Sequence, residues 1–315
     1  MTRRAKFGWI AVALNCAVSC TWAVWGSVEN FHEGWFSKTL LANLLWSLLY
    51  LSGAILWTVL GVVAIKWPRV GSVGVLFAGT AFGIFFLKIL THITLIAILS
   101  WLPFMGGFGL IGLLWWFGTP EPKGWAIFAS VGLPLLAFAI CAAEPVYRIS
   151  HRFDDHYRGA RVIKGNGVEL VWAQEGPGWP DKGVGYADAE QRCRKLSLNG
   201  ETLAATPQNI WRLPTVEEIA RSMTRRGQNS GGYWDPSRNI ARFKVMPDKE
   251  APLWNPNSGV IYWWTGSLDA KGSVYRMVFD GNVGPLSKSF KMDSLGFRAV
   301  REVRPGDERV PVYTR

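Results

Sequence analysis

Apolar residues divide the chain into two unlike halves. The first half contains four long apolar runs, and a transmembrane helix needs about 20 such residues. The four predicted spans are residues 7–28, 40–65, 72–101 and 125–143. A further apolar run, residues 104–117, is shorter, is rich in glycine and follows Pro103. We predict a re-entrant or interfacial segment there, although a fifth span is the alternative.

Charged residues follow the same division. Residues 1–143 hold eight Lys or Arg and three Asp or Glu, whereas residues 144–315 hold 26 and 20. This contrast predicts an all-α transmembrane bundle followed by a water-soluble α+β domain. The net charge of +11 is concentrated beside the apolar runs, and no run of Lys or Arg in the second half exceeds two residues. The sequence therefore lacks the clustered basic patch that nucleic-acid binding needs.

The distribution of Lys and Arg predicts how the chain is oriented in the membrane, because cytoplasmic loops carry the excess. With four spans, one side receives Arg3, Arg4, Lys6, Lys66, Arg69, Arg148, Arg152, Arg158 and Arg161. The other side receives only Lys38 and Lys123. We therefore expect a multi-pass protein of a bacterial inner (plasma) membrane, with both termini and the soluble domain in the cytoplasm. A fifth span would place that domain on the opposite side.

Two ionisable residues, Lys88 and His92, fall inside the third predicted span. They are four residues apart and would share one helix face. Ionisable groups within a span are costly, which makes them candidates for function. No acidic residue lies in any predicted span, so we interpret the pair as structural. A transporter or channel-like function of the helices is the alternative that rests on this pair.

Residues 144–164 form a basic linker. We expect a helix that continues from the last span, with its basic side on the lipid surface.

Only one cysteine, Cys193, lies in the second half, so the soluble domain has no internal disulfide. Cys193 falls at helical spacing with apolar residues and is predicted to be a core residue.

The second half contains signals for short strands and two helices. Thr215 and Glu218 form an S/T-x-x-E capping box, which predicts that a helix begins at residue 216. Asp280-Gly-Asn282 predicts a turn. The expected elements are strands at 167–173, 260–265, 273–279 and 297–303 and helices at 186–198 and 216–225. A long irregular region, 227–259, precedes the last three strands, and we expect a flexible tail at 304–315.

Several short motifs occur in a recognisable order. They are LVW at 170–172, WRLPT at 211–215, YWWT at 262–265, VFDG at 278–281 and GFRAVR at 296–301. In this order they resemble the Lcl C-terminal-like domain, a bacterial relative of the formylglycine-generating-enzyme (sulfatase-modifying-factor) superfamily. The resemblance covers residues 165–303 and implies a C-type-lectin-like α+β fold. It does not extend to the membrane half.

The enzymes of this superfamily hold copper with a cysteine pair or iron with histidines. Positions 262–301 contain no cysteine, and no histidine follows His156. Neither metal site can be carried over, so we predict a non-catalytic domain without a cofactor. The motif residues that we interpret as structural are Trp211, Arg212, Pro214, Thr215, Glu218, Gly296 and Arg298.

The resemblance implies that irregular loops form a recognition face. The ligand-binding candidates are Tyr233, Trp234, Trp254, Asn255, Trp264, Arg276 and Lys288. Trp263 and Trp264 are adjacent in a strand, so one should point inward and the other outward.

The predicted function is a membrane-anchored sensor or binding protein whose domain holds a protein, peptide or glycan. The helices could also support a homo-oligomer. The alternatives are a variable display protein of a diversity-generating retroelement and a metal-dependent enzyme of the formylglycine-generating type.

Overall fold

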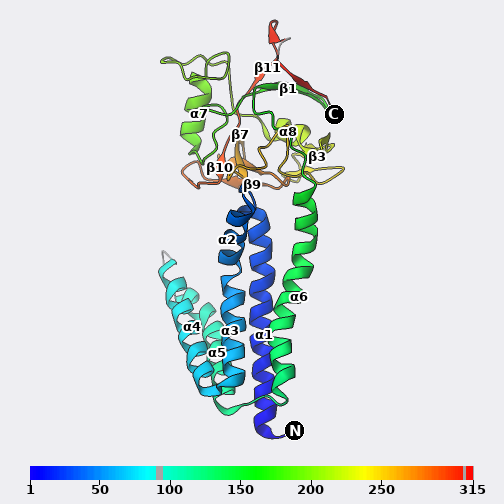
Figure 1. Cartoon of the computed structure of the whole chain (residues 1–315). Helices are drawn as coiled ribbons and strands as arrows, with labels where there is room; N and C mark the ends of the chain where they lie inside the picture. Colours follow the sequence, from blue (N-terminus) through cyan, green and yellow to red (C-terminus); the bar gives the residue numbers. More distant parts are fainter. Residues whose placement is uncertain (90–94, 308–309, 315) are drawn as a thin grey trace. The chain divides into compact units, whose positions relative to one another are not determined.

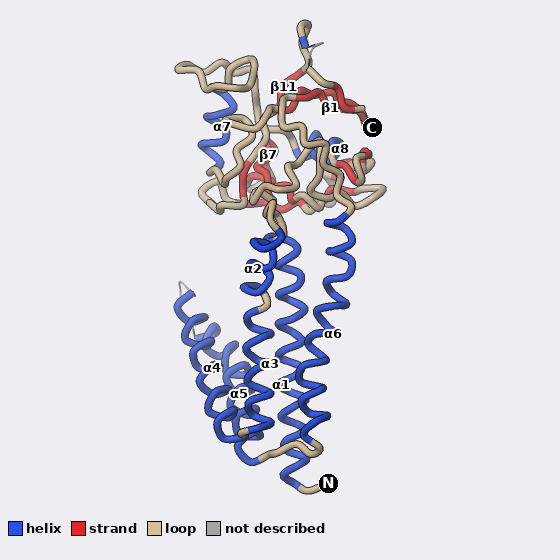
Figure 2. The backbone as a smooth tube through the Cα atoms, in the orientation of Figure 1, coloured by secondary structure: helices blue, strands red, loops and turns tan. Residues whose placement is uncertain are grey.

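The computed structural model describes residues 1–89, 95–307 and 310–314, and the chain divides into two compact units (Figure 1). The first unit comprises residues 1–35 and 40–147, and the second comprises residues 36–39 and 148–315. The first unit consists of helices, whereas the second is rich in strands and loops (Figure 2). The predicted division into a helical half and an α+β half is confirmed at this level.

Seven helices lie wholly or largely in the described part of the first unit. They are α1 (Arg3–Glu29), the π-helix η1 (Asn30–Gly34), α2 (Leu40–Tyr50), α3 (Ser52–Lys66), α4 (Pro68–Ile89), α5 (Leu95–Phe117) and α6 (Lys123–Ser150). Three segments are long and apolar enough to cross a membrane: Arg3–Gly34, Pro68–Phe85 and Lys123–Ser150. A fourth is added if α2 and α3 together form one bent span. The chain therefore has the helices of a membrane protein.

The predicted span at 40–65 is broken near its middle. The axes of α2 and α3 meet at 59°. The break is followed by Ser52 and Gly53, a residue pair at which helices commonly kink. A Cβ atom on Gly53 would lie 2.7 Å from the indole of Trp22, so no larger side chain fits there. Close packing against α1 thus accompanies the bend.

The prediction of one continuous span at 72–101 is wrong, because α4 and α5 form an antiparallel pair. Ser72 Oγ on α4 donates to the carbonyl of Gly112 on α5 at 2.7 Å. Further along α4, Gly79 packs against Phe108. Residues 104–117, predicted to be a re-entrant or interfacial segment, belong to the 23-residue helix α5.

The two intramembrane polar residues cannot be compared with their prediction. Position 88 lies in α4, but its side chain is outside the described part of the structure, and His92 lies outside the described residues. The structural interpretation of this pair therefore stays a prediction.

Helices α1 and α6 run parallel to each other (Figure 1). Trp9 Nε1 donates to the carbonyl of Glu121 at 2.8 Å. About two helical turns further along α1, Cys16 Sγ lies 4.0 Å from Ser130 Oγ. Near the start of α1, the Thr119 N–H donates to the carbonyl of Arg4 at 3.0 Å. It follows that α6 starts beside the N-terminal end of α1 and runs toward the opposite end of the helical unit.

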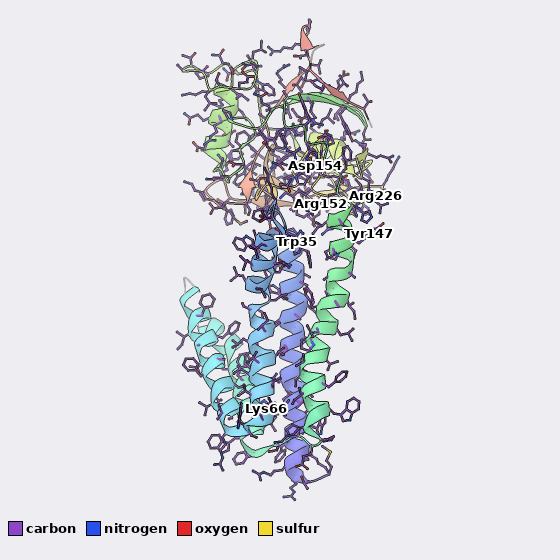
Figure 3. All side chains as sticks on the ribbon, viewed as in Figure 1. Trp35, Lys66, Tyr147, Arg152, Asp154 and Arg226 are labelled. Carbon is purple, nitrogen blue, oxygen red and sulfur yellow. The ribbon has the colours of Figure 1, made fainter. Side chains whose placement is uncertain are left out.

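The predicted basic linker differs from the structure. Helix α6 continues past residue 143, as expected, but it ends at Ser150, and residues 161–165 form strand β1. The basic side chains pair with carboxylates of the second unit: Arg158 with Asp154 at 2.8 Å and Arg161 with Asp155 at 2.7 Å. Figure 3 labels Asp154 in this segment. These cations serve the folding of the second unit rather than a free basic surface.

The second unit has two short helices and twelve strands in its described residues. They are β1 (Arg161–Gly165), β2 (Val168–Trp172), α7 (Tyr186–Lys195), α8 (Val216–Ser222), β3 (Thr224–Arg225), β4 (Gln228–Asn229), β5 (Tyr233–Asp235), β6 (Ile240–Arg242), β7 (Tyr262–Leu268), β8 (Val274–Val278), β9 (Val283–Leu286), β10 (Leu295–Gly296), β11 (Val300–Glu302) and β12 (Val312–Tyr313). Two four-stranded sheets have the orders β11-β2-β1-β12 and β10-β7-β8-β9. Because β12 pairs with β1, the end of the chain is not simply the flexible tail that we expected.

The sheet that contains β7 lies between two hydrophobic clusters. Trp263 belongs to one cluster and Trp264 to the other, and both side chains are 0% exposed. The two residues do point to opposite faces, as strand geometry requires. The expectation that one of them faces outward is wrong, because both faces of this sheet are covered.

The capping box at the start of α8 is present. The Glu218 N–H donates to Thr215 Oγ1 at 3.2 Å, and the Thr215 N–H donates to Glu218 Oε2 at 2.8 Å. The helix ends at Ser222, three residues earlier than expected. The predicted turn at 280–282 is also present, since the Gly281 N–H donates to the carbonyl of Val278 and Gly281 has φ +90°.

Candidate ligand-binding surface

Arg276 of β8 lies against Tyr262 of β7. The centre of its guanidinium group is 4.7 Å from the centroid of the tyrosine ring, within the range of a cation–π contact. Arg276 is half-buried, and its Nη1 has no hydrogen-bond acceptor in the part of the chain that the structure describes. A buried N–H without an acceptor is costly. Because Nη1 is enclosed, only the accessible part of this half-buried side chain can meet a further partner.

Lys288, on the exposed loop after β9, lies over Tyr186 at the start of α7. Its Nζ is 5.5 Å from the ring centroid. Tyr186 is 5% exposed, and its hydroxyl donates to Glu190 Oε1 at 3.1 Å. Burial, followed by the negative charge of Glu190, raises the pKa of Tyr186 to about 12. The phenol therefore stays neutral at physiological pH and supplies an uncharged ring under the lysine.

The two pairs lie on the same side of the central sheet. Trp264 is directly opposite Arg276 in the β7–β8 ladder, and directly opposed residues point to the same face. Tyr186 meets Trp264 edge to face, with ring centroids 5.5 Å apart. Trp264 thus forms a buried floor between them. We define the cation–tyrosine surface as Tyr186, Tyr262, Arg276 and Lys288.

Tyr233 and Trp234 do not belong to this surface. Trp234 packs on Tyr275, with ring centroids 5.3 Å apart. Tyr275 precedes Arg276 in β8 and so points to the other face of the sheet. Tyr233 is 47% exposed and faces solvent on β5. The predicted loop residues are therefore divided between two faces.

Two other ligand-binding candidates, Trp254 and Trp264, are buried, contrary to the expectation of a surface role, and a third, Asn255, is half-buried and hydrogen-bonded. Trp254 is 1% exposed and stacks on Trp263 at 3.8 Å between ring centroids, and Trp264 is fully buried. Asn255 uses its side-chain amide to bond Glu175 and its side-chain carbonyl to accept from the Asn257 N–H. Aromatic residues in an irregular region can belong to the core when they pack on the face of a sheet.

The motif residues form a network of fixed contacts. Trp211 Nε1 donates to the carbonyl of Ser197 at 2.8 Å, and Arg212 Nη2 lies 2.6 Å from Glu218 Oε1. Arg298 is 0% exposed. The remaining contacts are the Gly266 N–H donating to the carbonyl of Pro214 and Gly296 packing closely against Val260. These contacts agree with a structural interpretation.

The sequence did not single out Tyr186 and Tyr262. Tyr262 stood inside a motif, but nothing local showed that Arg276 would cover it. Tyr186 was visible only as the start of a predicted helix. Pairing each cation with its ring requires the β7–β8 register and the packing of α7, which are tertiary features.

Nothing in residues 1–89, 95–307 and 310–314 gathers three or more His, Cys, Asp or Glu side chains in an arrangement that could hold a metal ion. Cys193 is 2% exposed, and burial raises the pKa of its thiol, which keeps it protonated. A protonated, enclosed thiol is a poor nucleophile and a poor metal ligand.

Comparison with known proteins identified no matching family model, no matching curated protein and no matching solved structure.

Proposed function

We propose that this chain is a membrane-anchored binding protein whose second unit holds an anionic ligand on the cation–tyrosine surface. The observation that supports this most directly is the half-buried side chain of Arg276, whose guanidinium lies over Tyr262 on the same sheet face as Trp264. Carboxylate, sulfate and phosphate groups are the acceptors that guanidinium binds best. Lys288, exposed over Tyr186, adds a second positive charge.

The proposed ligand is a protein segment, peptide or glycan that carries such an anionic group. In this proposal the two cations contact the ligand, and Tyr186 and Tyr262 position them from below, because Tyr186 is 5% exposed and Tyr262 is half-buried. The role is non-catalytic. The C-type-lectin-like resemblance in the sequence supports binding rather than chemistry, and it remains part of the proposal.

The test is binding of the purified full-length protein, in detergent, to arrays of acidic and neutral glycans and peptides. Arg276→Gln and Lys288→Gln remove the two charges while keeping an unbranched polar side chain. Lys271→Gln is the matched control, since Lys271 is exposed on the β7–β8 turn. We expect each of the first two variants to weaken binding to acidic ligands by at least about tenfold, the loss of one charged hydrogen bond. Unchanged binding in both would contradict the proposal.

We further propose that the second unit lies on the opposite side of the membrane from the N-terminus. The parallel course of α1 and α6 supports this, because α6 begins beside Trp9 and ends at the other end of the helical unit. The chain would then cross five times, with α4 and α5 as separate crossings. The 23 residues of α5 extend about 34 Å at 1.5 Å per residue, enough to span.

The charge distribution fits five crossings as well. Lys123 now joins the N-terminal end, together with Lys66 and Arg69 between α3 and α4. That end carries Arg3, Arg4, Lys6, Lys66, Arg69 and Lys123 and would be cytoplasmic. The arginines after α6 argued for a cytoplasmic domain, but they are ion-paired within a folded unit. Long domains cross the membrane largely regardless of their charge.

Protease accessibility of tags in intact spheroplasts tests this orientation. We expect a C-terminal tag to be cleaved in intact spheroplasts and an N-terminal tag to be cleaved only after lysis. Protection of both tags until lysis would support four crossings and a cytoplasmic domain, as the charge count alone predicts. That outcome would reject the proposed orientation without affecting the ligand-binding test.

A further inference from the structure

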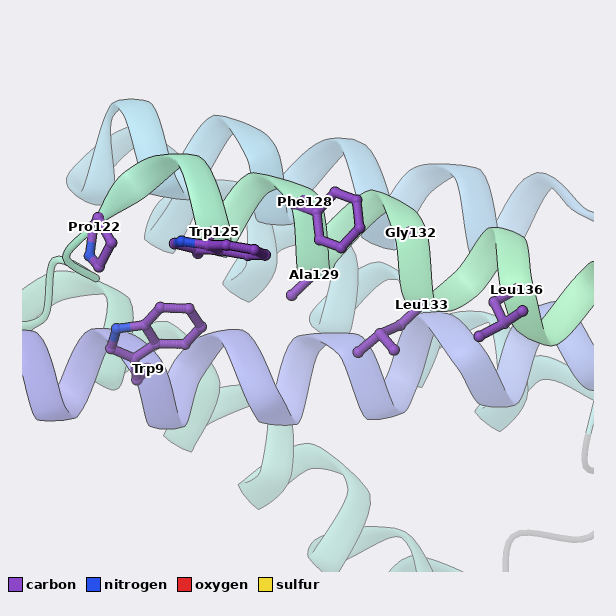
Figure 4. Close-up of a pocket in the computed structure, with 8 residues that line it drawn as sticks. All are labelled: Trp9, Pro122, Trp125, Phe128, Ala129, Gly132, Leu133 and Leu136. Carbon is purple, nitrogen blue, oxygen red and sulfur yellow. The ribbon is translucent and has the colours of Figure 1, made fainter.

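A groove runs along the contact between α1 and α6, two of the three candidate membrane spans (Figure 4). Its volume is about 630 Å³. The lining residues are almost all apolar: Trp9, Pro122, Trp125, Phe128, Ala129, Gly132, Leu133 and Leu136. The indole N–H of Trp9 is already used, because Nε1 donates to the Glu121 carbonyl. The groove is therefore a surface for hydrocarbon.

Small residues keep the groove open. A Cβ atom on Gly132 would have only the ring of Phe128 within reach, at 4.0 Å. From Trp125 to Leu136 the groove follows about 16 Å of α6, at 1.5 Å per residue. One leaflet of a bilayer has a hydrocarbon depth of about 15 Å. The groove thus has the length of one leaflet.

Positive charge surrounds the Trp9 end of the groove. Lys6 precedes Trp9 by one helical turn, and Lys123 follows Pro122; both side chains are exposed. Segments 1–28 and 118–143 contribute four basic residues, Arg3, Arg4, Lys6 and Lys123, against one acidic residue, Glu121. Cations at the end of an apolar groove between helices match a lipid with an anionic headgroup.

We propose that this groove is a binding site for one anionic phospholipid. An acyl chain would lie along Gly132 and Leu133, and the phosphate headgroup would lie beside Lys6 and Lys123. Trp9 and Trp125 mark the headgroup level, where tryptophan side chains are enriched. This site is separate from the ligand-binding surface of the second unit and does not depend on it.

Native mass spectrometry of the full-length protein, equilibrated with equal amounts of phosphatidylglycerol and phosphatidylcholine, tests the site. Lys6→Gln combined with Lys123→Gln removes the charge, with Lys66→Gln combined with Arg69→Gln as the matched control. Gly132→Leu fills the groove, with Gly109→Leu as its control, because a Cβ atom on Gly109 meets nothing within 4 Å. The charge and groove variants alter different features, so a folding failure in one leaves the other informative.

We expect the wild-type protein to retain phosphatidylglycerol in preference to phosphatidylcholine. The Lys6/Lys123 variant should lose about fivefold of this preference per lysine, while its control keeps it. Gly132→Leu should lose the bound lipid, and Gly109→Leu should retain it. Equal retention of the two lipids, or retention unchanged by Gly132→Leu, would overturn the proposal. So would loss of a dimer in Gly132→Leu, which would identify the groove as a contact between copies of the chain.

Discussion

Arg152 holds the buried carboxylate of Asp248 through two hydrogen bonds, from Nε to Oδ2 at 3.1 Å and from Nη2 to Oδ1 at 2.9 Å. Asp248 is 1% exposed and also accepts from Arg225 Nη1 at 3.2 Å. Arg152 follows the last residue of α6 by two positions, and Figure 3 labels it there. The ion pair therefore fastens the first residues of the second unit to a loop in its interior.

Replacing Asp248 with Asn should lower the stability of the second unit by about 3–5 kcal/mol, because it leaves buried guanidinium groups without a counter-charge. Thermal unfolding of the purified protein, followed by tryptophan fluorescence, measures this. Asp188→Asn is the matched control: its side chain is 62% exposed and 3.9 Å from Arg192. A surface pair of this kind contributes at most about 1 kcal/mol. Equal effects of the two variants would contradict a structural role for Asp248.

The capping box should make the second unit sensitive to acid. Burial by itself would raise the pKa of Glu218, but hydrogen bonds from Arg212 and from the Thr215 N–H outweigh it and lower that pKa. A carboxyl group with a lowered folded-state pKa stabilises the fold above its unfolded pKa, about 4.3 for Glu. This stability is lost as the pH falls through the folded-state pKa.

Glu218→Gln removes this titration. The free energy of unfolding of the variant should be lower at pH 7 and should fall less steeply below about pH 4.3 than that of the wild-type protein. Denaturation at a series of pH values measures both slopes. Identical slopes would show that Glu218 has the same pKa in the folded and unfolded chains.

Arg298 should not tolerate replacement by Lys. Its Nε donates to the carbonyl of Ala173 at 2.7 Å, and its Nη1 donates to the carbonyls of Pro252 and Leu253, each at 2.8 Å. The guanidinium centre also lies 3.7 Å from the ring centroid of Trp179. A lysine ammonium cannot reproduce this planar set of contacts.

We expect Arg298→Lys to lose about 2–3 kcal/mol, since at least one buried carbonyl would be left without a donor. Arg242→Lys is a suitable control, because Arg242 is only half-buried in β6 and pairs with Asp235 at 3.4 Å. Unfolding by denaturant measures the difference between the two variants. A loss no larger than that of the control would show that charge alone is sufficient at position 298.

The antiparallel pairing of α4 and α5 predicts a specific cross-link. A Cβ atom on Gly112 would lie 2.7 Å from Cγ of Leu76. Leu76→Cys combined with Gly112→Cys, in a chain without its four natural cysteines, should therefore form a disulfide under mild oxidation. Leu76→Cys with Gly106→Cys is the control, since a Cβ atom on Gly106 meets nothing within 4 Å. After the chain is cleaved between α4 and α5, a disulfide keeps the two fragments together on a non-reducing gel. Separate fragments would contradict the antiparallel pairing and favour one continuous helix.

Features carried by neighbouring residues could be predicted without the structure. The capping box needs only Thr215 and Glu218 at the correct spacing, and the turn at 280–282 needs only residues that adopt its backbone angles. Both are present. Strand β2 and helix α7 likewise begin within one residue of their predicted positions. In each case the determining interaction lies within a few positions along the chain.

Burial could not be predicted in this way. Trp254 and Trp264 had the character of surface aromatics in an irregular region and a strand, yet both are inaccessible to solvent. The reason is that two clusters cover the β7 sheet, one on each face. Which residues cover a sheet depends on chain segments that are far apart in sequence.

The sequence by itself determined that this chain has apolar segments long enough to cross a membrane, followed by a separate α+β unit, because apolar run length and charge depend on neighbouring residues. It did not determine where the chain reverses direction, since residues 72–101 are mostly apolar, apart from Lys88 and His92, and contain no strong turn signal. The contact between Ser72 and Gly112 decided that. The tertiary structure likewise placed Arg276 over Tyr262 and Lys288 over Tyr186, because strand register and helix packing bring together residues that the sequence keeps apart.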